Sequence, residues 1–158
     1  MILDNFLIVS GTVAGTATSP TITGQGPITA TAVSTNTVDL LQARDLFEGN
    51  DLVKLRAQIV QAFNNLTSLT IEIIQADDAA LSSNVTVVGS SGAIPLASLT
   101  AGKRFILEGN ARISSTGQRY LGARYTVTGT APTTGTVLAE FGDQIADFKT
   151  YAVGFAVL

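Results

Sequence analysis

Acidic side chains are the groups in this sequence whose types and spacing come nearest to a catalytic arrangement. Asp45, Glu48 and Asp51 lie within seven residues, and Asp77 and Asp78 are adjacent. Hydrolysis of a glycosidic bond needs two carboxyl groups that face each other across a cleft. A hydrolase that uses carboxylates alone is therefore one alternative, although turns and strand ends in solvent are the commoner place for such residues. The first group also lacks the ligand spacing of a calcium loop.

Histidine and cysteine are absent from the chain, and so is tryptophan. Without histidine and cysteine, the common zinc sites, disulfide bonds and Ser–His or Cys–His nucleophiles cannot be built. We therefore expect a protein that is not an enzyme, with no catalytic residue, no cofactor and no metal ion.

Charge is sparse in this chain of 158 residues. Charged residues make up 13% of it, about half the usual quarter, and the net charge is −3. Soluble monomers normally keep a charged surface, so a surface rich in Thr, Ser, Gly and Ala suggests that a partner covers much of it. An ordinary β domain with a neutral polar surface is the alternative.

The same totals argue against two classes of partner. A negative net charge gives no reason to expect nucleic-acid binding. No apolar run reaches the roughly 18 residues of a membrane span, and the first residues lack the basic region of a signal peptide. We expect neither nucleic acid nor membrane as a partner, and we expect assembly in the cytoplasm.

Strands must position any functional residue, and the clearest strand pattern runs from Arg119 to Thr130. Apolar and small side chains alternate there with polar ones, which is typical of a strand with one buried face. A second alternating run follows at Thr136–Phe141, after a link that contains Gly and Pro. The two runs predict a hairpin at the centre of an antiparallel domain.

Short alternating runs continue through the rest of the chain. The segment 52–63 also fits a helical stripe, but the strand pattern is preferred because a second alternating run follows the break at Asn64 and Asn65. Together the runs predict an all-β fold, an antiparallel jelly roll or β-sandwich. The expected strands are 29–33, 38–41, 52–63, 69–74, 85–88, 104–108, 119–128, 136–141 and 148–155.

The first 28 residues differ from the rest. Residues 12–27 consist mainly of Gly, Thr, Ala, Ser and Pro, with little to fill a core, which is typical of an extended arm or loop. We therefore divide the chain into an N-terminal strand and arm, 1–28, and a single β domain, 29–158. Such an arm is either disordered or ordered by a neighbour.

Contact with a partner is expected at two sets of residues. The apolar N-terminus and the polar residues of the strands supply the candidates, and Arg124 shares its strand face with small and hydroxyl residues that leave it free to pair with a neighbouring chain. The apolar candidates are Ile2, Leu3, Phe6 and Leu7. The polar candidates are Arg44, Asp45 and Arg124.

Several short motifs resemble one known family. They are Met1-Ile2-Leu3-Asp4, Val33-Ser34-Thr35-Asn36 with Asp39-Leu40, Ala43-Arg44-Asp45-Leu46, Leu99-Thr100-Ala101-Gly102, Arg119-Tyr120-Leu121 and Tyr125-Thr126-Val127-Thr128-Gly129-Thr130. In this order they resemble the jelly-roll capsid cement, or decoration, proteins of short-tailed bacteriophages of the Bordetella-phage type. Residues 12–27 and 148–158 match less well.

The resemblance implies a structural subunit of the virion. Such a protein would bind the outside of the shell formed by the major capsid protein, bridge neighbouring subunits and associate with itself as a dimer or trimer. A carbohydrate-binding or adhesin module is the alternative, because Tyr120, Tyr125 and Phe141 could form an aromatic platform for sugars.

Overall fold

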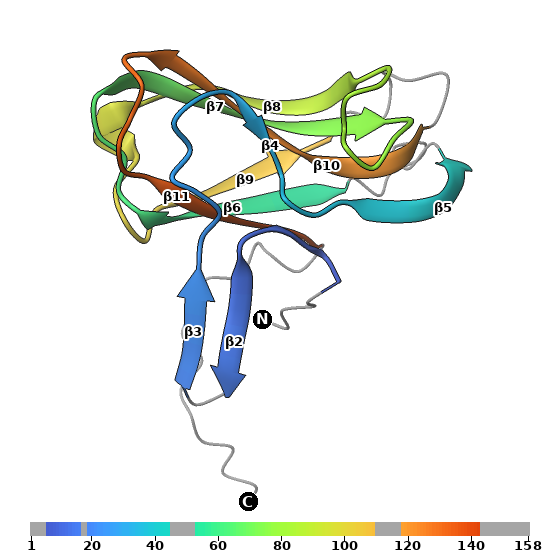
Figure 1. Ribbon diagram of the computed structural model, residues 1–158, viewed down its shortest axis with the longest axis horizontal. Coiled ribbons are helices and arrows are strands. Elements are labelled where there is room, and N and C mark those ends of the chain that lie inside the picture. Colours follow the sequence, from blue (N-terminus) through green and yellow to red (C-terminus); the bar gives the residue numbers. More distant parts are fainter. Residues whose placement is uncertain (1–5, 17–18, 45–52, 110–117, 143–158) are drawn as a thin grey trace, which may run out of the picture.

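Two antiparallel β-sheets packed face to face form the body of the protein, and a separate hairpin projects from it (Figure 1). The computed structural model describes residues 6–16, 19–44, 53–109 and 118–142. The architecture confirms the predicted all-β sandwich.

The order of the strands is that of a jelly roll. One sheet has the order β1 (Ile8–Ser10), β11 (Thr136–Phe141), β6 (Lys54–Gln61) and β9 (Arg104–Glu108). The other has the order β4 (Ala32–Val33), β10 (Gln118–Gly129), β7 (Leu66–Ala76) and β8 (Thr86–Pro95), and β5 (Val38–Arg44) also pairs with β10. A single 3-10 turn, Leu96–Ser98, follows β8 in the described part of the chain.

The core lies between the two sheets and is built by period-two alternation. Leu121 and Tyr125 of β10 and Ile71 of β7 are almost completely buried, as are Leu55 and Ile59 of β6 in the facing sheet. Burial of each such side chain contributes roughly 1.5–3 kcal/mol relative to exposure. The strand interpretation of residues 52–63 is therefore confirmed over β6.

A smaller core covers the outer face of β10 and β7. Ile74, Ala76 and Leu81 pack there, and Leu81 comes from the connection between β7 and β8. Gly122 leaves room for it, because a Cβ at this position would overlap Leu81 Cδ1 and make that side chain shift. The carboxylate of Asp78 holds the connection by accepting hydrogen bonds from the backbone and hydroxyl groups of the serines that follow.

The predicted hairpin of the two clearest strands is wrong. β10 pairs with β7, β4 and β5, whereas β11 pairs with β6 and β1, so the link between β10 and β11 crosses from one sheet to the other. The alternation located each strand correctly, but it carries no information about which strand lies beside it. The same crossing joins β6 to β7.

Two further segments differ from the expectation. β8 continues to Pro95 instead of ending at Val88, because the Gly- and Ser-rich stretch forms an irregular part of the strand in which Ser91 Oγ accepts a hydrogen bond from the Ile71 N–H, 3.0 Å. The strand expected at 148–155 lies outside the described residues.

A hydrogen bond inside the core joins the two sheets. The Tyr125 hydroxyl on β10 donates to Ser10 Oγ on β1 over 2.7 Å, and both residues are fully buried. Burial also raises the pKa of Tyr125, so the phenol stays protonated and able to donate. This bond ties the first strand of the sandwich to the opposite sheet.

Removal of the Tyr125 hydroxyl should show how much its hydrogen bond to Ser10 contributes to the stability of the fold. We expect Tyr125→Phe to lower the free energy of unfolding by about 1 kcal/mol, because Ser10 loses its buried partner. Chemical denaturation of Tyr125→Phe, Ser10→Ala and the double variant should give a coupling energy well above zero. Tyr120→Phe, on the outer face of the same strand, is the control, and an equal loss in that variant would contradict the prediction.

Candidate functional site

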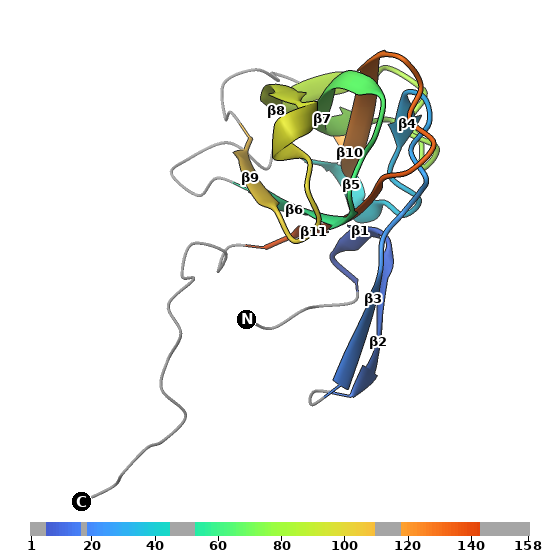
Figure 2. The ribbon, with the colours of Figure 1, turned by 90° about the vertical axis from the view of Figure 1, so that its left-hand side faces the viewer.

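The hairpin of β2 (Thr12–Thr16) and β3 (Ser19–Thr23) is the most unusual feature of the structure. It forms its own two-stranded sheet and extends away from the sandwich on the side of β1 and β11 (Figures 1 and 2). Its described side chains are exposed except for Val13, which is half-buried. No charged residue occurs from Asn5 to Val38. A hairpin of this kind is marginally stable alone, so its contacts at the base matter for its structure.

Both ends of the hairpin are anchored on β11. On one side β1 pairs with β11, with Ser10 opposite Ala139. On the other side Gln25 and Val137 exchange backbone hydrogen bonds of 2.8 and 3.0 Å. The chain therefore leaves β11 at one point and returns to it two residues away, and the hairpin lies between these points.

The side chain of Gln25 adds a second anchor. Its Nε2 donates to the Val33 carbonyl at 2.7 Å, and its Oε1 accepts from the Thr35 N–H at 3.0 Å. These bonds connect the base of the hairpin to β4, on the opposite sheet. One glutamine thus fixes the direction in which the hairpin leaves the sandwich.

Glycine at the base permits close backbone contact. Gly11 has φ +81°, in the left-handed region that favours glycine, and a Cβ there would overlap the Thr23 carbonyl oxygen. A Cβ at Gly24 would lie 2.7 Å from Thr136 Oγ1. The base is consequently packed tightly against β11.

The first 28 residues are therefore divided differently from the expectation. Residues 12–23 form the projecting part, but β1 belongs to the sandwich, with Ile8 and Val9 buried. Ile28 also lies in the core, 2% exposed. Composition indicated the exposed segment correctly and could not show that the residues on either side are structural.

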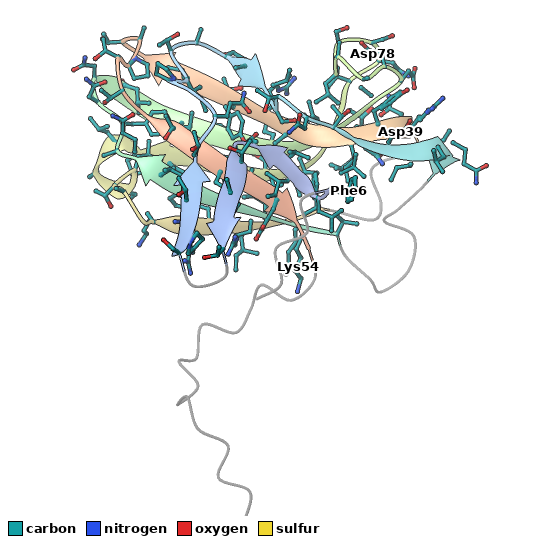
Figure 3. The ribbon with its side chains drawn as sticks, turned by 60° about the horizontal axis from the view of Figure 1, so that its bottom comes forward. Phe6, Asp39, Lys54 and Asp78 are labelled. Atoms are coloured by element: carbon teal, nitrogen blue, oxygen red, sulfur yellow. The ribbon has the colours of Figure 1, made fainter. Side chains whose placement is uncertain are left out.

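The predicted apolar contact residues are only partly described. Phe6 is 91% exposed, whereas Leu7 is half-buried, packs against the core and accepts a hydrogen bond at its carbonyl from the Phe141 N–H at 2.9 Å. In Figure 3, Phe6 and Lys54 lie on the side that carries the β2–β3 hairpin. Ile2 and Leu3 lie outside the described residues.

Of the predicted polar contact residues, only Arg124 has a described side chain, and that side chain does not join this surface. Arg124 lies on the outer face of the other sheet, and its Nε donates to Glu72 Oε2 over 2.7 Å. Arg124 therefore has an ion-pair partner within the chain, because cross-strand pairing places Glu72 directly opposite it. Arg44 pairs through its backbone with Gln118, and Asp45 lies outside the described residues.

An ion pair that the sequence did not indicate lies at one end of the sandwich. Arg119 donates to both carboxylate oxygens of Asp39, at 2.7 and 2.8 Å, and its guanidinium carbon lies 5.1 Å from the centre of the Tyr120 ring. These hydrogen bonds, followed by one from the Leu41 N–H, lower the pKa of Asp39 from its ordinary value of 3.8 to about 2. The partners are far apart in sequence, so no local pattern could reveal them.

The outer face of the first sheet carries charges next to the hairpin. Arg56 and Glu140 lie opposite each other on β6 and β11 and form a buried ion pair. Burial raises the pKa of Glu140 and lowers that of Arg56, while their mutual attraction favours the charged form of each. Lys54 and Glu108 form a more exposed pair at 3.6 Å.

The alternative activities find little support in these positions. Tyr125 and Phe141 are buried in the core, so the aromatic platform proposed for sugars is not present. Asp78 uses both carboxylate oxygens in its turn, where its hydrogen bonds to the backbone of Ser83 and to Ser82 lower its pKa. Asp77 accepts from Asn84 Nδ2 at 3.1 Å, and Glu48 lies outside the described residues.

Metal ligands and membrane spans are both lacking among the described residues. No group of three or more acidic side chains there is arranged to hold a metal ion. No helix in the described part of the chain is long and apolar enough to cross a membrane.

The protein is thus a jelly roll with one additional element, the uncharged β2–β3 hairpin, which projects from it between β1 and β4 in the chain. The chain belongs to the Bbp16 family, whose model matches residues 22–141. The family bears the name of a Bordetella phage protein, which makes this a bacteriophage-related protein. A search of the curated proteins finds no match.

The role of Gln25 in fixing the hairpin can be tested by truncation. We expect Gln25→Ala to speed hydrogen exchange of the amides in β2 and β3, because the base loses both side-chain hydrogen bonds to the opposite sheet. Exchange in β7 should stay unchanged. Gln61→Ala, an exposed glutamine on β6, is the matched control, and equal exchange in the two variants would show that Gln25 does not hold the hairpin.

The Asp39–Arg119 pair should be visible in a titration. Because the pKa of Asp39 is lowered to about 2, its contribution to stability is complete above its ordinary pKa and is lost as pH falls through the lowered one. The carboxyl carbon of Asp39 followed by NMR should therefore titrate near pH 2, and at a clearly higher pH in Arg119→Gln, where only the hydrogen bond from the Leu41 N–H remains. An unchanged midpoint in the variant would contradict the assignment of the shift to Arg119.

Proposed function

We propose that this protein is a capsid cement protein that binds the outside of a phage shell and bridges neighbouring subunits of the major capsid protein. The observation that carries the proposal is the β2–β3 hairpin, an exposed and charge-free extension held firmly at its base. Membership of a phage family and the jelly-roll fold agree with it. In this proposal the protein is not an enzyme, needs no cofactor and resides on the virion surface after assembly in the host cytoplasm.

The side of the sandwich that carries the hairpin is the proposed contact surface. It combines the hairpin with the exposed ring of Phe6 and with charged groups on β6 and β9. A cement protein needs contacts that reach more than one shell subunit, and a projecting hairpin beside a flat sheet supplies two such contacts. Repeated over a lattice, individually weak contacts hold the shell collectively.

Self-association is also part of the proposal. Capsid axes favour subunits that form closed dimers or trimers, and the sparse charge of the surface is consistent with covered area. Arg124 and the backbone of Arg44 lie on the sheet away from the hairpin, so this part of the protein would contact a different neighbour from the one that contacts Phe6.

The proposal is tested by sedimentation of the purified protein with expanded capsids that lack it. The full-length protein should co-sediment and raise the temperature at which the capsids break. A variant without residues 12–23 should bind much more weakly. Gly11 and Gly24 can be joined directly in this variant because a Cβ on Gly11 would lie only 3.1 Å from the Gly24 Cα. Absence of binding by the full-length protein would refute the proposal.

Two exposed apolar residues give a matched pair of substitutions. Phe6 is 91% exposed beside the hairpin, and Leu41 is 78% exposed on β5, at one end of the sandwich. Phe6→Ser should weaken capsid binding about tenfold or more, since burial of such a side chain is worth at least ~1.5 kcal/mol. Leu41→Ser should bind as the unchanged protein does. The reverse result would place the contact on the β5 end instead.

A further inference from the structure

The two edges of the β2–β3 hairpin are chemically different. The register places Gly15 opposite Pro20 and Val13 opposite Ile22. Proline has no N–H to donate, so the Gly15–Pro20 pair is of the type that makes no hydrogen bonds between its members. Hydrogen-bonded and non-hydrogen-bonded pairs alternate along two antiparallel strands. Val13 and Ile22, two positions further along, are therefore also a non-hydrogen-bonded pair.

Backbone groups of these pairs point away from the hairpin. On β2, the N–H and C=O of Val13 and Gly15 face outward along its free edge, the edge with which no strand of the described residues pairs. On β3, Pro20 interrupts the corresponding row, because it offers no donor there. Natural sheets use proline and charge to prevent pairing at exposed edges. Neither strand carries a charge, so proline is the only such protection available here. β3 contains Pro20, whereas β2 contains no proline.

We propose that the free edge of β2 pairs with β2 of a second copy of this chain. In an antiparallel arrangement about a two-fold axis, Val13 of one copy would exchange hydrogen bonds with Gly15 of the other. Ala14 would then face Ala14 of the second copy across the axis. The two hairpins would form one four-stranded sheet, which exceeds the minimum that a sheet needs for stability in water.

The charge pattern favours a second copy over other partners. At a two-fold axis each residue meets its own equivalent, so any charge near the axis would face a like charge. The hairpin is free of charge along its whole length, and Ala14 is small and exposed, which suits the close approach of side chains in a pair without hydrogen bonds. The family model matches from Ile22 onward, so β2, the strand proposed to pair, lies outside the matched residues.

This inference rests on the self-association in the proposed function and does not require capsid binding. Sedimentation velocity of the full-length protein without capsids tests it separately. The unchanged protein should be a dimer, twice 16.3 kDa. Val13→Pro removes an outward donor of β2 and should give a monomer with an unchanged melting temperature. Ile22→Pro removes the matching donor of β3 and should stay dimeric.

A complementary pair of variants tests the two-fold arrangement. Ala14→Lys and Ala14→Glu should each be monomeric, because like charges meet at the axis, and their mixture should form a heterodimer. Dimers in each separate variant, or no dimer in the mixture, would overturn the pairing of β2 with β2. A monomeric unchanged protein that still binds capsids would overturn this inference and leave the cement function standing.

Discussion

Strand β11 is the constraint on which both the sandwich and the hairpin depend. Along one side it pairs with β6 and so completes the core, and along the other it receives β1 and Gln25, the two ends of the hairpin. All described side chains of β11 from Val137 onward are buried. A strand that is covered on both faces and paired on both edges cannot move without disturbing both parts. The exposed hairpin is therefore attached to a strand that the rest of the fold holds in place.

The sequence was informative wherever the fold depends on local alternation. The strands at 104–108 and 136–141 were found with their bounds, because a strand with one face in the core must alternate. The partners of those strands were not found: β10 and β11 follow each other in sequence but lie in different sheets. Strand pairing depends on how the whole chain folds, and the residues of one strand do not encode it.

The candidate site, like the fold, could be predicted from the sequence only in part. The absence of charge and apolar bulk in residues 12–27 is enough, by composition alone, to indicate an exposed segment. Gln25 could not be recognised, because its function depends on Val33 and Val137, which are brought to it only by the fold. The partner of Arg124 within the chain could not be recognised for a related reason, since Glu72 lies opposite it only in the folded sheet.

The closeness of the two anchor points on β11 also makes the hairpin replaceable. Joining two points that are already adjacent costs little extra chain entropy as the connecting segment lengthens, about 0.6 kcal/mol for each doubling. A foreign peptide inserted between Thr16 and Ser19 would consequently leave the jelly roll intact. If the hairpin contacts the shell, its sequence can be exchanged to fit a different shell protein while the sandwich keeps its structure.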